Sequence, residues 1–220
     1  MFEKITPQPL FPTFIWMHQV DPKVAGPLNE KLRRDIDRLI SPKPPLKPGG
    51  TWQTEARLHT LEEFQDLVRI FMTASKGVLD QYEIDYGDIE ITGCWANVNP
   101  KGGVHQAHNH PNNYLSGVYY VEMPDEGTPI TFHDPRMQLT MIWPRVKRYN
   151  VHNSIVANVH AKAGHLILFP AWLVHSVDVN RAEGLRTSIS FNVMFSDFVK
   201  TMSYPKWDGI PLDRHKKMAG

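Results

Sequence analysis

The sequence predicts a mainly β fold with flanking helices, an α+β arrangement in which two N-terminal helices cover one face of an antiparallel β-sandwich or barrel. Apolar residues follow helical spacing in the first part of the chain, change to a period of two from Asp88 onward, and are then interrupted by regular turn signals. A chain of 220 residues suits one domain with one core. We therefore expect a single domain over residues 1–220, with a strand and supporting helices in 1–87, the β core in 88–196 and a C-terminal tail in 197–220.

The N-terminal part predicts one strand and two helices. Residues 11–20 have the composition of a strand, and residues 21–40 carry apolar side chains at helical spacing after Asp21, which is a plausible N-cap. A second helix is expected from about residue 61 to 82, because Thr60 is followed three residues later by Glu63 in the capping-box pattern. We expect both helices to pack against the sheet rather than to carry chemistry.

The remainder of the chain alternates between short strand patterns and turns. The expected strands cover residues 89–99, 115–123, 128–133, 154–160, 165–169, 172–179 and 185–195. In the last of these, Thr187, Ile189, Phe191 and Val193 share one face, and Arg186, Ser188, Ser190 and Asn192 share the other. The polar face either meets solvent or lines a cavity while the apolar face packs on the helices. The metal motif described next favours the cavity.

Composition excludes several classes of protein. The net charge of +1 gives no reason to expect a nucleic-acid partner, and no apolar stretch approaches the roughly 20 residues that span a bilayer. The first ten residues lack a signal-peptide pattern. A single cysteine, Cys94, excludes an intrachain disulfide and a cysteine-based zinc site. We therefore predict a cytoplasmic protein without a membrane partner.

Histidine is the residue type that points to chemistry. Of 11 histidines, eight lie between His105 and His175. His108 and His110 are two apart, so on an extended chain their side chains leave from the same face and can reach one metal ion. His175 follows a short apolar strand, and Arg186 comes 11 residues later with Ser188 beside it. An arginine at that place could bind an acidic co-substrate next to the metal through paired hydrogen bonds.

Six segments together resemble a known family. They are residues 93–99, 108–112, 115–120, 134–136, 164–170 and 186–192. Their order and spacing look like the bacterial and phage 2-oxoglutarate/Fe(II) oxygenases related to prolyl hydroxylases, and the resemblance covers roughly residues 52–194. It implies a double-stranded β-helix (a jelly-roll or cupin-like fold), one Fe(II), and 2-oxoglutarate and dioxygen as co-substrates. The implied activity is the oxidation, by default hydroxylation, of a small-molecule or peptide substrate.

The resemblance also assigns residues. It implies that His108 and His175 are iron ligands and that Arg186 binds the distal carboxylate of 2-oxoglutarate, assisted by Tyr120. Ser188, on the same strand face as Arg186, could add a hydrogen bond, and Ser116 is a further candidate. Where the wider superfamily has a carboxylate, this chain has His110. The third ligand is therefore either His110 or a nearby carboxylate, for which Asp134 and Asp178 are the candidates.

Two other functions stay open at this point. One is a cupin-type dioxygenase with three histidine ligands, which binds its substrate directly and needs no 2-oxoglutarate. The other is a non-catalytic β-sandwich that binds a metal or ligand. The connection over residues 137–153 is long, basic and aromatic, and we interpret it as a lid over the site. The sequence leaves homodimer formation open.

Overall fold

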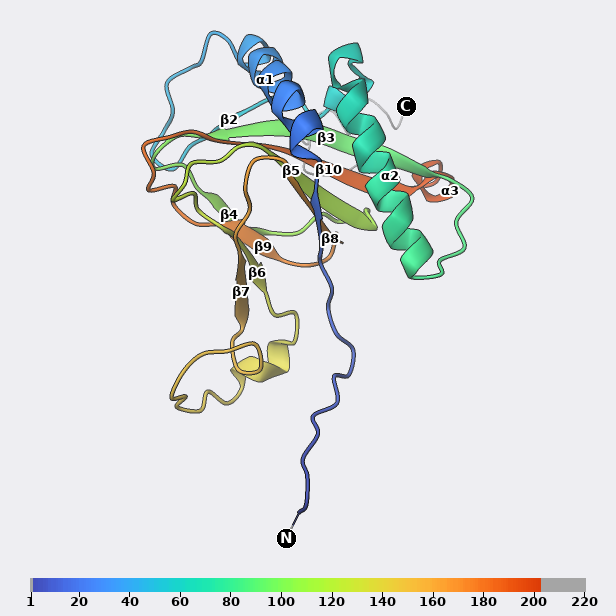
Figure 1. The fold of residues 1–220 in the computed structure, drawn as a ribbon, viewed down its shortest axis with the longest axis vertical. Coiled ribbons are helices and arrows are strands. Elements are labelled where there is room, and N and C mark those ends of the chain that lie inside the picture. Colours follow the sequence, from blue (N-terminus) through green and yellow to red (C-terminus); the bar gives the residue numbers. More distant parts are fainter. Residues whose placement is uncertain (1, 203–220) are drawn as a thin grey trace, which may run out of the picture.

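The protein consists of two antiparallel β-sheets that face each other, with two helices on the outside of the larger sheet (Figure 1). The computed structural model describes residues 2–202. The larger sheet has the strand order β1-β8-β5-β10-β3-β2, and the smaller one has the order β4-β9-β6-β7. The strands are β1 (Trp16–Gln19), β2 (Trp52–Gln53), β3 (Ile89–Asn99), β4 (His105–His108), β5 (Leu115–Glu122), β6 (Ile130–His133), β7 (Val156–Val159), β8 (His165–Pro170), β9 (His175–Val177) and β10 (Arg186–Phe195). This interleaved order confirms the predicted double-stranded β-helix.

Helices α1 (Pro22–Leu39) and α2 (Gln65–Gln81) cover the larger sheet, as predicted. Asp21 caps α1, because its side chain accepts a hydrogen bond from the backbone N–H of Lys23 at 2.8 Å. The predicted capping box of the second helix is wrong. Thr60 instead donates its hydroxyl to the carbonyl of Arg57, and two 3₁₀ turns, Leu58–Thr60 and Glu62–Phe64, precede α2.

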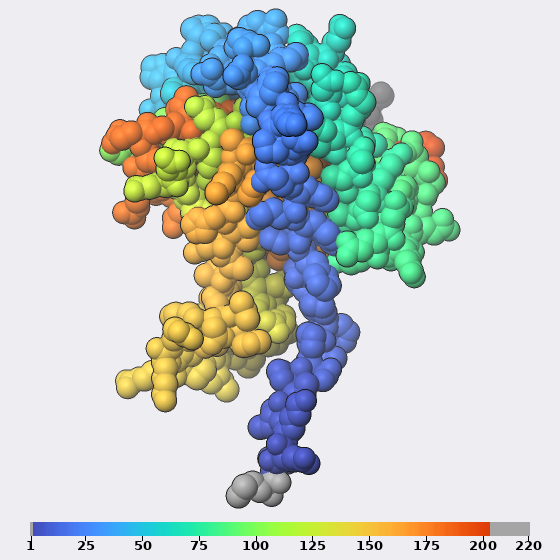
Figure 2. All heavy atoms as spheres, in the orientation of Figure 1, coloured from blue at the N-terminus to red at the C-terminus, as the bar shows by residue number. Residues whose placement is uncertain are grey.

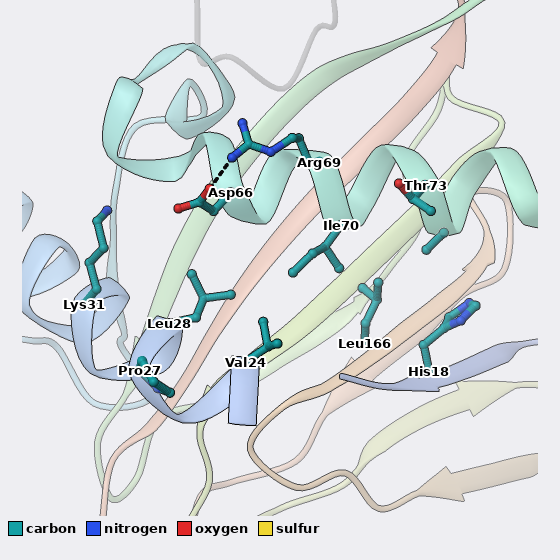
Figure 3. A pocket seen from close by; sticks show the side chains of 11 residues that line it. His18, Val24, Pro27, Leu28, Lys31, Asp66, Arg69, Ile70, Thr73 and Leu166 are labelled. Atoms are coloured by element: carbon teal, nitrogen blue, oxygen red, sulfur yellow. Dashed lines mark hydrogen bonds and ion pairs between the residues drawn. The ribbon is translucent and has the colours of Figure 1, made fainter. Parts of the chain in front are cut away.

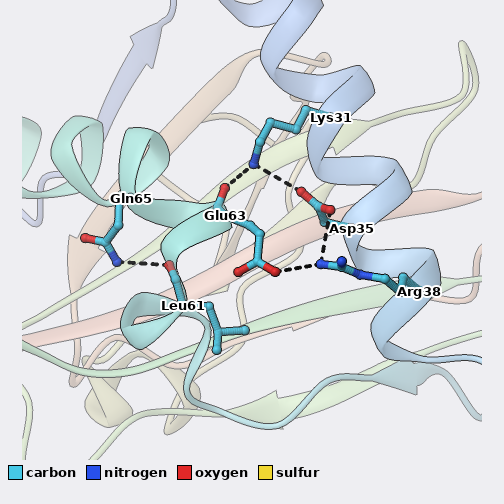
Figure 4. A network of polar contacts seen from close by, with 6 residues as sticks. All are labelled: Lys31, Asp35, Arg38, Leu61, Glu63 and Gln65. Atoms are coloured by element: carbon cyan, nitrogen blue, oxygen red, sulfur yellow. Dashed lines mark hydrogen bonds and ion pairs between the residues drawn. The ribbon is translucent and has the colours of Figure 1, made fainter.

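A polar network joins α1 to the second of these turns (Figure 4). Arg38 contacts Glu63 at 2.7 Å and Asp35 at 3.3 Å, while Lys31 binds Asp35 at 3.1 Å and also the backbone carbonyl of Glu63. Because the side chains of Lys31, Arg38 and Glu63 are 39–61% exposed, each ion pair contributes only about 0.2–1 kcal/mol. The network therefore sets the orientation of the two segments more than it stabilises the fold.

Strand β10 lies at the centre of the larger sheet, between β3 and β5. Its apolar face packs under the helices, where the ring of Phe191 stacks on Phe71 of α2 with centroids 3.8 Å apart. On the other face, Arg186, Ser188 and Ser190 line a cavity between the two sheets. The polar face of this strand therefore lines a cavity and does not meet solvent.

Several strands are shorter than the sequence patterns predict. The strand expected over residues 11–20 forms only at Trp16–Gln19, where it pairs with β8, and the proline-containing segment before it extends away from the body (Figure 1). The strand expected over residues 172–179 is reduced to β9, and β2 was not predicted. No helix within residues 2–202 is both long enough and apolar enough to cross a membrane. Of the expected tail, α3 (Ser196–Val199) is present, and residues 203–220 lie outside the described part of the chain.

A cavity of about 720 Å³ lies on the outside of the larger sheet, between α1 and α2 (Figure 3). Val24, Leu28 and Ile70 form its apolar walls, and Arg69, which is paired with Asp66, lies on its rim. It is separate from the cavity between the sheets, and His108, His110 and His175 do not line it.

Gly117 of β5 allows the helices and the sheet to pack closely. A Cβ atom at this position would overlap the ring of Phe191 and lie 2.8 Å from Cδ2 of Leu168. Gly117→Ala should therefore lower the free energy of unfolding by about 1–3 kcal/mol, as overpacking in a filled core does. Urea denaturation measures the change.

The matched control is Gly77→Ala in α2, where an added Cβ meets nothing within 4 Å. That substitution should stabilise the protein by about 0.5–1 kcal/mol, because glycine is unfavourable inside a helix. Equal effects of the two alanines would contradict the packing assigned to Gly117.

Candidate metal centre

Three histidines meet at one end of the smaller sheet. His108 is the last residue of β4 and pairs with His175 of β9, and His110 follows two residues after His108. The backbone N–H of His110 donates to the carbonyl of Ala171, which holds this segment against the turn that leads into β9. One ring nitrogen from each of the three histidines lies within 4.8 Å of the others. The predicted pair and the distant histidine are therefore brought together by the pairing of β4 with β9.

Backbone carbonyls orient two of the three rings. Nδ1 of His108 lies 2.7 Å from the carbonyl oxygen of Gln106, and Nδ1 of His175 lies 3.0 Å from that of Leu173. A carbonyl oxygen only accepts, so Nδ1 carries the proton and donates it in both rings. The lone pair is then on Nε2, which is the nitrogen that a metal ion would bind.

Burial favours the neutral form of His110 and His175. It lowers the pKa of His110 from its ordinary value of 6.5 to about 3, with smaller contributions from His175 and His108. Burial likewise lowers the pKa of His175 to about 4, although its hydrogen bond to Leu173 acts in the opposite direction. A metal ion binds the neutral form of histidine, so the environment favours the state that is competent to bind.

Within the described residues, no carboxylate belongs to this cluster. Asp134 is engaged by Arg136, whose Nε and Nη2 lie 3.0 and 2.6 Å from its two oxygens. The hydrogen bond to Arg136 holds the pKa of Asp134 below its usual range. Asp178 is exposed at the surface. Neither of the two carboxylates considered as a third ligand therefore joins the histidines.

The cavity between the sheets has a volume of about 350 Å³, and the three histidines lie along its wall. The same cavity is lined by Arg186 and Ser188 of β10 and by Trp95 and Asn97 of β3. Trp95 and Asn97 were not among the residues expected to line the site. The signal was present in the period of two, since residues 95, 97 and 99 share one face of β3.

Arg186 is a buried cation without a carboxylate partner. Its residue is 2% exposed, and no acidic side chain in residues 2–202 forms an ion pair with it. Nη1 lies 3.3 Å from the Ser188 hydroxyl, Nη2 lies 3.4 Å from the Tyr120 hydroxyl, and Nε has no partner. Burying a charge without a counter-ion is unfavourable, so this arrangement is suited to an anionic ligand.

The remaining candidates differ in their distance from this arrangement. Ser116 donates to Oδ1 of Asn192 at 2.7 Å and is not among the residues that line the cavity. His105 does line it, and its Nε2 lies 3.1 Å from Oδ1 of Asn99. Burial, and then the charge of Arg186, lowers the pKa of His105 to about 4. His105 is thus a neutral side chain in the wall that also holds the histidine cluster and the arginine.

Comparison with known proteins finds one matching family model. Residues 93–192 match the family model described as "Putative 2OG-Fe(II) oxygenase", and this range contains the three histidines and Arg186. No curated protein is found to be a significant relative.

Among solved structures, the epimerase SnoN from nogalamycin biosynthesis has a TM-score of 0.62 at 14% identity, covering 91% of this chain and 88% of its own. HygX from Streptomyces hygroscopicus has a TM-score of 0.59 at 12% identity, and the match covers 84% of this chain and 83% of HygX. A prolyl-4-hydroxylase from Pseudomonas putida has a TM-score of 0.57 at 14% identity, and the match covers 83% of this chain and 93% of the hydroxylase. These likenesses establish the fold. The sequence match to the oxygenase family model extends over residues 93–192.

Proposed function

We propose that the chain is an Fe(II)- and 2-oxoglutarate-dependent oxygenase in which His108, His110 and His175 hold the metal. The support is a set of three nitrogen donors on one cavity wall. Burial keeps His110 and His175 neutral, and backbone carbonyls orient His108 and His175. Imidazole suits iron among other transition metals, and three ligands leave three positions of an octahedral ion open for 2-oxoglutarate and dioxygen. The family match favours iron.

We further propose that Arg186 binds the distal carboxylate of 2-oxoglutarate. The observation that carries this proposal is a buried, unpaired guanidinium in the same cavity as the three histidines. A carboxylate can accept two parallel hydrogen bonds from a guanidinium. Ser188 and Tyr120 already touch the guanidinium and can hold it in one orientation. The neighbour HygX was solved with nickel and 2-oxoglutarate bound, which fits the same use of this cavity.

The same observation weighs against both other functions. In a three-histidine dioxygenase that binds its substrate directly, no anionic co-substrate would offset the unfavourable burial of Arg186. A non-catalytic binding module would not need three clustered histidines and an anion site on one cavity of about 350 Å³. Either protein would be more stable with an apolar residue in place of Arg186.

The residues of the chain divide the work of the reaction. With iron and 2-oxoglutarate bound, such a site couples the decarboxylation of 2-oxoglutarate to succinate and carbon dioxide with the insertion of one oxygen atom of dioxygen into a substrate C–H bond. Arg186 orients the co-substrate through its distal end. Phe169, Val118 and Ile130 line the cavity beside the histidines and exclude water.

The primary substrate is either a small molecule or a peptide. HygX was solved with hygromycin B bound, whereas the Pseudomonas putida neighbour is a prolyl-4-hydroxylase, so proteins of this fold serve both kinds of substrate. In this chain the cavity wall near the metal site adds Trp95 and the neutral side chains of Gln53, Asn97 and Asn109. A cytoplasmic location stays a prediction.

The iron-loaded protein should convert 2-oxoglutarate to succinate, and it should do so slowly even when no primary substrate is present. Arg186→Met should raise the Kd for 2-oxoglutarate at least about tenfold, because each hydrogen bond to a charged group contributes roughly 1.5–3 kcal/mol. Metal content should stay unchanged. Calorimetry gives the Kd, and chromatography of the products gives succinate.

The control is Ser116→Ala, because Ser116 lies outside the cavity wall. It should leave the affinity for 2-oxoglutarate within about twofold of the wild type. Unchanged affinity in Arg186→Met would show that the carboxylate binds elsewhere. Absence of succinate under all conditions, with metal bound, would favour a non-catalytic protein.

His110→Ala should lower the affinity for divalent metal by more than roughly 100-fold. Residues that only hydrogen-bond to a metal ligand typically cost about 10–100-fold when they are replaced. His110→Ala removes one of three donors, whereas His110→Asp should retain tight binding because it supplies a carboxylate oxygen. Anaerobic titration with Fe(II) measures both. The control is His133→Ala, since His133 lies in the same sheet and contacts Ser176 rather than the cluster. Equal losses in His110→Ala and His133→Ala would disprove the assignment.

The metal-free protein should lose stability as the pH falls from about 6.5 toward 4. His105, His110 and His175 have pKa values lowered to about 4, 3 and 4, so in this range the unfolded chain binds protons that the folded chain does not. The free energy of unfolding is then highest above pH 6.5 and decreases below it. Urea denaturation between pH 7.5 and 5 measures the slope, which His110→Gln should reduce by about one proton. An unchanged slope would mean that His110 titrates normally.

A further inference from the structure

The exposed apolar side chains gather on two projecting segments. One is the N-terminal segment, residues 2–15, in which Phe11 is 95% exposed. The other is the β6–β7 arm, residues 137–153, in which Met141 is 82% and Ile142 is 80% exposed. The other large exposed apolar residues of the described chain are scattered over the body. Contiguous apolar exposure of this kind marks an interaction surface.

Both segments project from the same side of the molecule. Figure 2 shows them extending beyond the body and standing apart from each other toward their ends. The N-terminal segment leaves the body where Pro12 and Phe14 lie with Trp172 along one small cavity. The arm follows β6, in which Phe132 pairs with His175 of the metal centre. The two surfaces therefore flank the part of the barrel that carries the histidine cluster, and neither covers the other within one chain.

The exposed area is large enough for a stable interface. Phe2, Phe11, Trp143 and Tyr149 are 90%, 95%, 55% and 61% exposed, which corresponds to about 600 Å² per chain if an aromatic side chain buries roughly 200 Å². Two chains that covered these residues would bury about 1,200 Å² from aromatics alone, which reaches the range of stable interfaces. The prolines at 7, 9 and 12 keep the N-terminal segment extended, so that ordering it on a surface costs little entropy.

The charges on the two segments disfavour one of the possible pairings. The arm carries Arg145, Lys147 and Arg148 and no acidic residue, so two arms placed face to face would repel each other. The N-terminal segment carries one acid and one base, Glu3 and Lys4, and is neutral overall. Arm against N-terminal segment avoids this repulsion and covers both segments, and a two-fold axis forms the contact twice.

We propose that this chain forms a homodimer in which the N-terminal segment of each protomer packs on the β6–β7 arm of the other. This pairing covers both apolar segments with a single symmetry operation. It also places a segment of the second copy beside the end of the barrel that holds the histidine cluster. The residues predicted as a lid then act as a dimer contact.

Light scattering coupled to gel filtration tests the assembly. The full chain should elute with twice its monomer mass of 25.3 kDa. Ile142→Glu on the arm and Ile5→Lys on the N-terminal segment should each give a monomer with an unchanged melting temperature. The matched control is Trp143→Asp against Phe198→Asp, since the two side chains are 55% and 54% exposed and only Trp143 lies on the arm. Trp143→Asp should dissociate the dimer, and Phe198→Asp should not.

Mixing two monomeric variants tests the crossed arrangement. A heterodimer of Ile142→Glu with Ile5→Lys has one wild-type contact and one contact that joins a glutamate to a lysine. The mixture should therefore restore the dimer. If the arms paired with each other, Ile5→Lys alone would stay a dimer, and if the N-terminal segments did, Ile142→Glu alone would. Either result, or a mixture that stays monomeric, would show that the proposal is wrong.

Two further outcomes would overturn the dimer. One is a wild-type chain that stays monomeric at every concentration. The other is a monomer that sediments with anionic phosphatidylglycerol vesicles, and not with neutral phosphatidylcholine vesicles, in a manner that requires Ile142. That result would assign the basic, apolar arm to a lipid surface instead.

Discussion

The alternation of strand β10 is the constraint on which the rest of the structure depends. One face is locked under the helices by Phe191 against Phe71, and the opposite face turns Arg186 into the space between the sheets. Because side chains alternate along a strand, a shift of one residue would bury the arginine under the helices and expose the apolar residues to the cavity. The helices therefore contribute to the site without touching it, since they fix the register that keeps Arg186 in place.

Replacing the expected carboxylate by His110 changes the charge of the site. The described residues of the cavity wall contain no acid, so a divalent metal and Arg186 would together present three positive charges. A dianionic co-substrate then meets more positive charge than it would in a site that includes a carboxylate ligand. At low effective dielectric such a difference is substantial. Burial keeps His110 and His175 unprotonated, so these two side chains add no positive charge to a cavity that already contains a buried arginine.

Short sequence patterns predicted local structure correctly where one interaction determines it, and incorrectly where several interactions compete. Asp21 caps α1 as expected because its side chain reaches a neighbouring N–H. Thr60 fits a capping pattern equally well, yet Leu61 is extended and the chain makes two short turns that bury Leu58 and Phe64. The gain from burying two large apolar side chains exceeds that of one cap, which is about 1 kcal/mol. Strand ends were misplaced for a related reason, since a strand extends only as far as its neighbour pairs with it.

The sequence by itself determined a mainly β fold with helices on one face, the placing of His108 and His110 on one face of an extended segment, and the presence of an arginine on the polar side of the last strand. These follow from periodicity and spacing within short stretches of chain. Only the tertiary structure brought His175 to within reach of the other two histidines, kept Asp134 and Asp178 out of that cluster, and showed that Arg186 is buried without a counter-ion in residues 2–202. Each of those facts is a relation between segments, or the absence of one, and depends on how two sheets close on each other. Burial and pairing are properties of that closure, and the order of residues along one strand does not contain them.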